Sequence, residues 1–101
     1  MRHALIDVQN QRVLCVGKVC KFSLRKDNKK PTILLVDIAV HTNDDGVVRL
    51  DHMWFTIGDR LYESDCNIGD RLCMEVTVKA YKKGNNHFDI KLKYPNNVIV
   101  L

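Results

Sequence analysis

The residues most able to do chemistry in this chain are lysines gathered in two short polar segments. Residues 25–30 read Arg-Lys-Asp-Asn-Lys-Lys, and residues 82–86 read Lys-Lys-Gly-Asn-Asn. Lysine and arginine side chains bind phosphate oxygens, so clusters of them favour a polyanionic partner. The alternative is that both segments are ordinary solvated loops. The expected phosphate contacts are Lys26, Lys29, Lys30, Lys82 and Lys83, with Lys21, Arg25, Lys79 and Lys91 in support.

Aromatic side chains near such a cluster could stack on nucleic-acid bases, at ~1–3 kcal/mol per base. Tyr81 is the first candidate, because it directly precedes the second basic segment on the polar parity of its strand. Trp54 or Phe55 is the second candidate, depending on which of them faces outward. Phe22 and Phe88 share parity with apolar residues and are expected in the core. The alternative for both candidates is packing against the rest of the protein.

Catalytic and metal chemistry find little support in the sequence. Asp51 and His52 are adjacent, so in a strand they point to opposite faces and cannot form a direct dyad; we expect His52 to be structural. There is no phosphate-binding loop and no Gly-x-Ser-x-Gly motif. The cysteines form no Cys-x-x-Cys pair, and the histidines are scattered. We therefore expect a protein that is not an enzyme, with no catalytic residues, no metal site and no cofactor. The four cysteines, expected as reduced thiols, are Cys15, Cys20, Cys66 and Cys73.

Length and composition predict an ordinary globular protein with one domain, residues 1–101, of which 46% is hydrophobic and 28% charged. No apolar run approaches the ~18 residues of a membrane span, and the first residues lack the apolar core of a signal peptide, so we expect no membrane contact and a cytoplasmic location. The net charge of +4 is unevenly distributed. Residues 1–36 carry +6, residues 37–70 carry −6 and residues 71–101 carry +4. Basic ends around an acidic middle predict a polarised surface if the fold brings the ends together.

Alternation of apolar and polar residues predicts five strands. Gly17, inside the first strand, predicts a bulge or a sharp bend. Asp59 is expected to cap a single helical turn after the third strand. Pro95 is expected to end the fifth strand and turn the chain into a last apolar stretch. The predicted strands are residues 13–25, 32–40, 47–56, 72–81 and 88–94.

Parity also predicts which side chains are buried. In the second strand the even-numbered apolar residues are expected in the core, which leaves Ile33, Leu35 and Ala39 exposed. In the fifth strand Tyr94 shares parity with Ile90 and Leu92. The third strand stays ambiguous, because Leu50, His52 and Trp54 share one face, and Met53 and Phe55 share the other.

Two stretches resemble the OB-fold superfamily of oligonucleotide- and oligosaccharide-binding modules. Val13-x-Cys15-Val16-Gly17-Lys18-Val19 is similar to the first strand of such modules, where a glycine lets one strand serve both sheets. Asn67-Ile68-Gly69-Asp70-Arg71-Leu72, running on to Val76-x-Val78, is similar to the Gly-Asp entry of their fourth strand. The resemblance spans residues 13–94 and implies an all-β, five-stranded Greek-key barrel with a short connector or helical turn between strands three and four. It also implies that loops 25–30 and 82–86 flank one binding face.

Two functional hypotheses follow. The first is binding of single-stranded nucleic acid, DNA favoured over RNA, with little sequence preference, as an accessory factor in DNA replication or of a mobile element. The alternative is a protein-interaction module, a dimer or a subunit of a larger complex, that does not bind nucleic acid. Its interface would be the apolar terminal stretches, residues 4–6 and 98–101.

Overall fold

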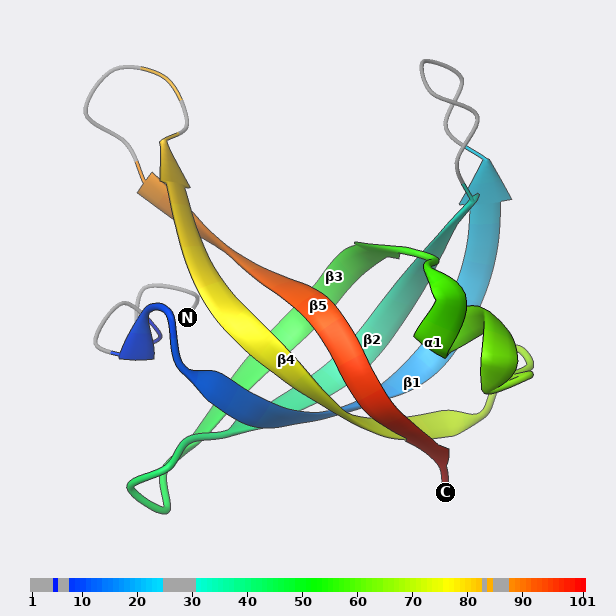
Figure 1. The fold of residues 1–101 in the computed structure, drawn as a ribbon, viewed down its shortest axis with the longest axis horizontal. Helices are drawn as coiled ribbons and strands as arrows, with labels where there is room; N and C mark the ends of the chain where they lie inside the picture. Colours follow the sequence, from blue (N-terminus) through cyan, green and yellow to red (C-terminus); the bar gives the residue numbers. More distant parts are fainter. Residues whose placement is uncertain (1–4, 6–7, 25–30, 83, 85–87) are drawn as a thin grey trace.

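The fold is seen in a computed structural model that describes residues 5, 8–24, 31–82, 84 and 88–101 (Figure 1). Five antiparallel strands form one sheet in the order β3-β2-β1-β4-β5, and one short helix joins β3 to β4. These features confirm the predicted number of strands and the helical turn. The elements are β1 (Arg12–Leu24), β2 (Pro31–His41), β3 (Val47–Thr56), α1 (Asp59–Glu63), β4 (Arg71–Lys82) and β5 (Phe88–Val100).

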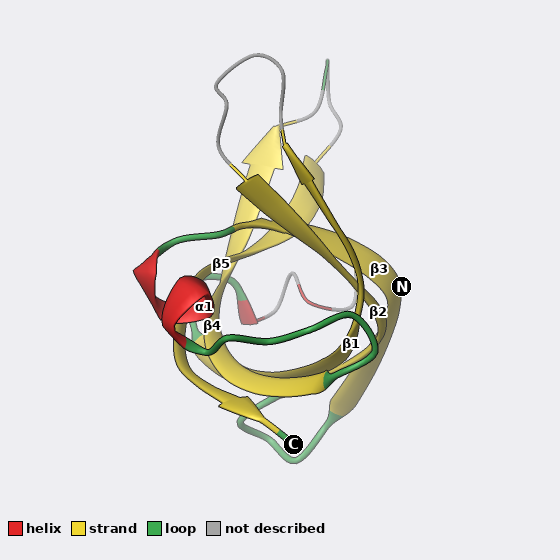
Figure 2. Ribbon diagram, turned by 90° about the vertical axis from the view of Figure 1, so that its right-hand side faces the viewer, coloured by secondary structure: helices red, strands yellow, loops and turns green. Residues whose placement is uncertain are grey.

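Strand β1 is the central element of a strongly curled sheet (Figure 2). Its first half, from Arg12 to Lys18, pairs with β4, and its length from Leu14 to Leu24 pairs with β2. Gly17 lies where the two ladders overlap. A Cβ atom at Gly17 would lie 3.2 Å from Ile38 Cγ1 and 3.3 Å from Leu35 Cβ, so the neighbouring strand leaves little room for a side chain. The predicted irregularity at Gly17 is confirmed, because the register with β2 shifts between Val16 and Lys18.

The predicted burial of β2 is wrong in its first half, and the bulge at Gly17 explains why. Ile33 and Leu35 are fully buried, although parity predicted them exposed. Asp37 has a φ of 50° and lies in the two-residue stretch of β2 opposite Gly17. The extra residue reverses the alternation. Ile38 and Val40 are therefore buried as well, and an exposed apolar face on β2 at Ile33 and Leu35 does not exist.

The structure also decides which aromatic side chains are buried and which are exposed. The buried residues of β3 are Leu50, Met53 and Phe55, which leaves Trp54 43% exposed and resolves the ambiguity of that strand. Phe22 was predicted to be buried but is 43% exposed. It lies at the end of β1, in a hollow of about 420 Å³ that α1 also lines. The side chain of Phe88 lies outside the described part of the chain.

The core also includes residues from outside the sheet. Leu5 is fully buried, so it is not part of an exposed terminal edge as the interaction hypothesis expected. Leu61 buries the inner side of α1, which lies against β5. The residue preceding α1 is Gly58 in extended conformation, so Asp59 is the first helical residue and the prediction that it caps the helix is wrong. Burial raises the pKa of the Cys15 thiol to about 12, with a smaller contribution from Cys73. Cys15 is thus a neutral core residue.

Candidate nucleic-acid interface

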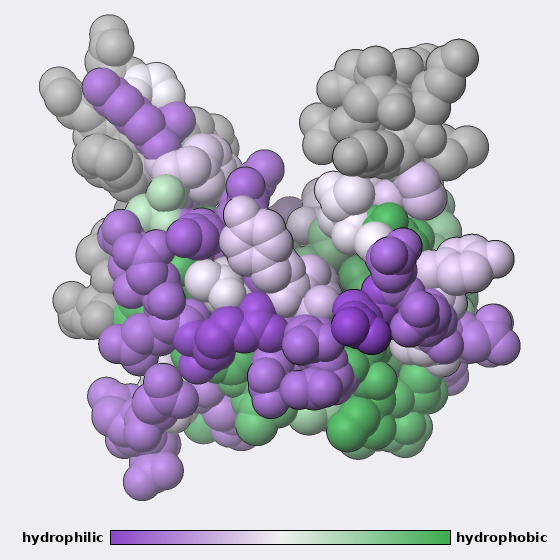
Figure 3. All heavy atoms as spheres, in the orientation of Figure 1, coloured by the Kyte–Doolittle hydropathy of each residue, from purple (hydrophilic) through white to green (hydrophobic). Residues whose placement is uncertain are grey.

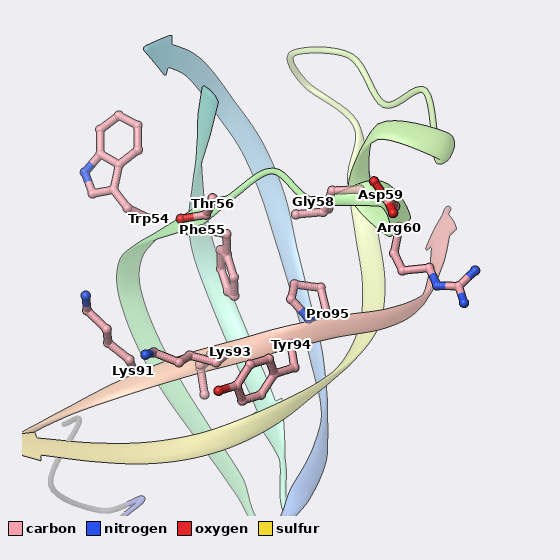
Figure 4. A pocket seen from close by; sticks show the side chains of 12 residues that line it. Trp54, Phe55, Thr56, Gly58, Asp59, Arg60, Lys91, Lys93, Tyr94 and Pro95 are labelled. Carbon is pink, nitrogen blue, oxygen red and sulfur yellow. The ribbon is translucent and has the colours of Figure 1, made fainter. Parts of the chain in front are cut away.

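The edge strands β3 and β5 share a hollow of about 420 Å³, which the start of α1 also lines (Figure 4). We call this hollow the groove. Trp54 lies on the β3 side, and Tyr94 lies on the β5 side. Lys91 and Lys93 extend from β5 on the same side of Tyr94. The groove therefore combines exposed aromatic faces with ammonium groups, the two kinds of group that single-stranded nucleic acid requires.

Trp54 is held in place from β1 across the sheet. Lys21 pairs in register with Leu34, and Leu34 pairs with Trp54, so all three side chains lie on the outer face. The Lys21 ammonium lies 5.5 Å from the centroid of the Trp54 ring. Such a cation–π contact contributes ~0.5–1 kcal/mol at exposed sites and keeps a positive charge beside the ring. The structure thus brings together two residues that the sequence proposed as binding residues.

Tyr94 was missed by the sequence analysis, which placed it on the buried parity of its strand. It is 63% exposed and has a φ of 57°, an unusual conformation for a bulky residue. The register between β4 and β5 shifts twice, between Cys73 and Glu75 and between Glu75 and Thr77. This irregularity turns Tyr94 outward. Strand β5 also continues through Pro95 to Val100, so the predicted turn at Pro95 is wrong.

Arg12 holds this irregular part of β5. Its Nη1 donates to the Tyr94 carbonyl oxygen at 2.7 Å and to Thr77 Oγ1 at 3.0 Å. Its Nη2 donates to the Glu75 carbonyl oxygen at 3.2 Å and lies 3.9 Å from Glu75 Oε2. One guanidinium thus connects β1, β4 and β5 at the residue that carries the exposed ring. The sequence Tyr94-Pro95-Asn96-Asn97 could have predicted an irregularity here, because proline and asparagine are unfavourable in a regular strand.

A basic surface continues from the groove onto β4. Lys79 on β4 and Lys91 on β5 lie directly opposite each other in the ladder between these strands. Two like charges in such positions repel each other and destabilise the pair. Lys79 Nζ donates to Asn10 Oδ1 at 3.0 Å, and Lys91 Nζ lies 5.2 Å from the centroid of the Tyr81 ring. A bound anion would relieve the remaining repulsion.

Tyr81 is the least available of the predicted stacking residues. Its side chain is half-buried, and its hydroxyl donates to Asp89 Oδ2 at 3.1 Å. Lys91 also lies over its ring. Tyr81 therefore positions Lys91, and Trp54 and Tyr94 offer the more exposed rings.

The remaining basic candidates lie near or outside the described residues. Lys82 is exposed at the end of β4. Strands β1 and β4, which precede the basic segments, end at the same end of the molecule (Figure 1). Strands β2 and β5, which follow them, begin there too. The turn with Asp44 and Asp45 lies at the opposite end. The candidates that fall outside the described residues are Arg25, Lys26, Lys29, Lys30 and Lys83.

Acidic residues are few at the groove. Asp59 lies on its rim, next to Arg60, and Arg60 Nη1 lies 3.7 Å from the exposed Glu63 Oε2. An exposed pair of this kind contributes little to stability and leaves Arg60 free to reorient toward an anion. The described lining of the groove therefore has a net positive charge, because Asp59 is outnumbered by Lys91, Lys93 and Arg60.

The described part of the chain offers no support for metal chemistry or for a membrane-spanning helix. Among the described residues, no three His, Cys, Asp or Glu side chains lie close enough together to hold a metal ion. No helix in that part is long and apolar enough to cross a membrane. Comparison of the chain with known protein families, with curated proteins and with solved structures found no match.

Proposed function

We propose that this protein binds single-stranded nucleic acid along the groove between β3 and β5. The observation that carries the proposal is the pair of exposed rings, Trp54 on β3 and Tyr94 on β5, that line one hollow together with Lys91 and Lys93. Bases stack on the rings, and phosphates contact the lysines. The contacts are to ring faces and backbone charges, which every nucleotide offers, so little sequence preference is expected.

The proposal favours a single strand over a duplex for a physical reason. A base can stack on a protein ring only after it has left its own stack, which costs a duplex a few kcal/mol per flipped nucleotide. In addition, Trp54 and Tyr94 lie on different strands of the curled sheet, so a flexible strand can follow the groove from one ring to the other.

The proposal includes the OB-fold architecture that the sequence resembles. Support comes from the order of five strands, from α1 between β3 and β4, and from the groove to which both edge strands contribute. In an OB-fold the loops after strands one and four flank the binding face, and here these loops are the two basic segments.

A fluorescence titration tests the proposal directly, because Trp54 is the one tryptophan in the chain. Addition of a 16-nucleotide thymidine oligonucleotide at low salt should quench the tryptophan emission, with a dissociation constant in the micromolar range or tighter. The logarithm of the association constant should fall linearly with the logarithm of the salt concentration. Neutralisation of phosphates by Lys91 and Lys93 alone predicts a slope of about −1.4.

Two controls make the titration decisive. A duplex of the same length should bind at least tenfold more weakly, and a matched uridine oligonucleotide tests the preference for DNA over RNA. Binding without quenching of Trp54 would locate the site elsewhere. Absence of binding at low salt, or equal affinity for the duplex, would refute the proposal.

A further inference from the structure

We propose that two copies of this chain associate through an apolar row on the outer face of the sheet, remote from the groove. The row consists of Val16, Ala39, Cys73 and Ile99. This inference does not depend on nucleic-acid binding.

The ladder register places these four side chains side by side. Ile99 pairs with Cys73, Cys73 pairs with Val16, and Val16 pairs with Ala39, so the row crosses β5, β4, β1 and β2. Paired residues of an antiparallel sheet point to the same face, and here that face is turned away from the core. Ile99 is 57% exposed and the other three are half-buried.

Further apolar side chains widen the row. Leu14 and Val47 are both exposed and lie on the same outer face, because Leu14 pairs with His41 and His41 pairs with Val47. A shallow hollow of about 740 Å³ includes Val16, Ala39 and Val47 in its lining. In Figure 3 apolar atoms gather at the lower right, where the end of β5 lies in Figure 1. A contiguous apolar surface of this kind is typical of an interaction site.

The charges around the row favour a second copy as the occupant. Arg71 lies on one side of the row, where it pairs with the exposed Lys18, and Arg49 continues the row on β3 opposite Ala39. Both arginines line the hollow, and within the described residues neither forms an ion pair or a side-chain hydrogen bond. The turn that leads into Val47 carries Asp44 and Asp45, both exposed. The Asp44 carboxylate accepts hydrogen bonds from the Thr42 hydroxyl and from the Gly46 N–H, which lower the pKa of Asp44 below its usual range. Asp44 is therefore ionised at neutral pH.

A surface with an apolar middle, an acidic side and a basic side is complementary to itself. A two-fold axis along the row brings the acidic side of one copy to the basic side of the other, and each contact then occurs twice. A purely acidic partner would satisfy the arginines but would meet repulsion at Asp44 and Asp45. A polyanion would meet the same repulsion.

The dimer would leave both grooves open. Arg49 and Trp54 lie on the same strand five residues apart, which corresponds to about 16 Å. The proposed interface therefore covers the part of β3 that begins at Val47, and the groove uses the part that ends at Thr56.

Analytical ultracentrifugation from 1 to 500 µM tests the inference on the intact chain without nucleic acid. Wild type should sediment as a monomer and a dimer in concentration-dependent equilibrium. Ile99→Asp should weaken the dimer at least tenfold. Tyr62→Asp, at a residue that is 82% exposed outside the row, should not.

A second pair of variants keeps the test valid if Ile99→Asp fails to fold. Arg49→Glu with Arg71→Glu should leave only monomer, because four acidic groups would then repel across the axis. Arg60→Glu with Lys82→Glu makes the same change of net charge elsewhere and should leave the dimer intact. A monomer at every concentration of the wild type would overturn the inference. A dimer that withstands both the Ile99 and the arginine variants would also overturn it, because its interface would lie elsewhere.

Discussion

The groove and the apolar row both lie on the outside of one curled sheet, yet their chemistry differs. In the groove Trp54 and Tyr94 share the surface with Lys91 and Lys93. In the row four apolar side chains follow one another across four strands without a charge between them, and Arg49 comes next on β3. Ammonium groups beside the rings keep the groove hydrated, because the free energy of desolvating them exceeds the gain from burying the rings. The residues that lie beside the apolar groups, more than the exposure of those groups, therefore decide which partner a surface can bind.

Charge reversal should separate the two surfaces with the largest effect. Lys91→Glu with Lys93→Glu should weaken oligonucleotide binding at least a hundredfold at low salt, because two attractive contacts become repulsive. Arg49→Glu with Arg71→Glu makes the same change of net charge on the other surface and should weaken binding far less. Both double variants are measured by fluorescence anisotropy with the thymidine oligonucleotide. Equal losses in the two would mean that net charge alone, and not the groove, attracts the ligand.

Removal of a single ring should give the next largest effect. Trp54→Ala should weaken oligonucleotide binding by about 5- to 150-fold, the equivalent of ~1–3 kcal/mol, and should keep the salt slope because no phosphate contact is lost. The measurement is anisotropy at three salt concentrations. Tyr62→Ala, at the exposed tyrosine of α1, is the matched control and should bind like wild type. A changed slope in Trp54→Ala would contradict the assignment of Trp54 to base stacking.

Loss of Arg12 should affect the groove indirectly and more weakly. Arg12→Ala removes the donors to the Tyr94 and Glu75 carbonyl oxygens, so the Tyr94 ring loses its fixed position. We expect a three- to tenfold loss of affinity and a lower free energy of unfolding by about 1–3 kcal/mol, measured in urea. Dimerisation should persist, because Arg12 is not in the row. A variant that binds oligonucleotide with full affinity would show that Tyr94 does not need this support.

The smallest effect is expected at the acidic turn. The pKa of Asp44 is lowered in the folded state, first by the Thr42 hydroxyl and then by the Gly46 N–H, so its stabilising contribution is present above its ordinary pKa. That contribution is lost as the pH falls through the lower pKa of the folded state. Asp44→Asn should therefore lower the thermal midpoint slightly at pH 7, and the difference should shrink as the pH falls below the ordinary pKa of an aspartate. A difference that stays constant with pH would mean that the charge of Asp44 does not matter.

The sequence determined the local structure of this protein. Alternation marked the strands, because a strand with one buried face must change polarity at every second residue. Gly17 marked the site where β2 approaches too closely for most side chains, and the position of the basic segments in the chain indicated a polarised surface. Lys21, Trp54 and Lys91 were proposed from residue type and neighbourhood, and the structure places all three at or beside the groove.

Only the tertiary structure decided which face each side chain occupies. The irregularities at Asp37 and Tyr94 insert residues that have no direct partner on the neighbouring strand, and each one reverses the alternation beyond it. Ile33 and Leu35 entered the core for this reason, and Tyr94 left it. Parity counts residues along one strand, whereas burial depends on the register between two. A shift of one residue in that register exchanges the buried and exposed faces, and no local pattern records it.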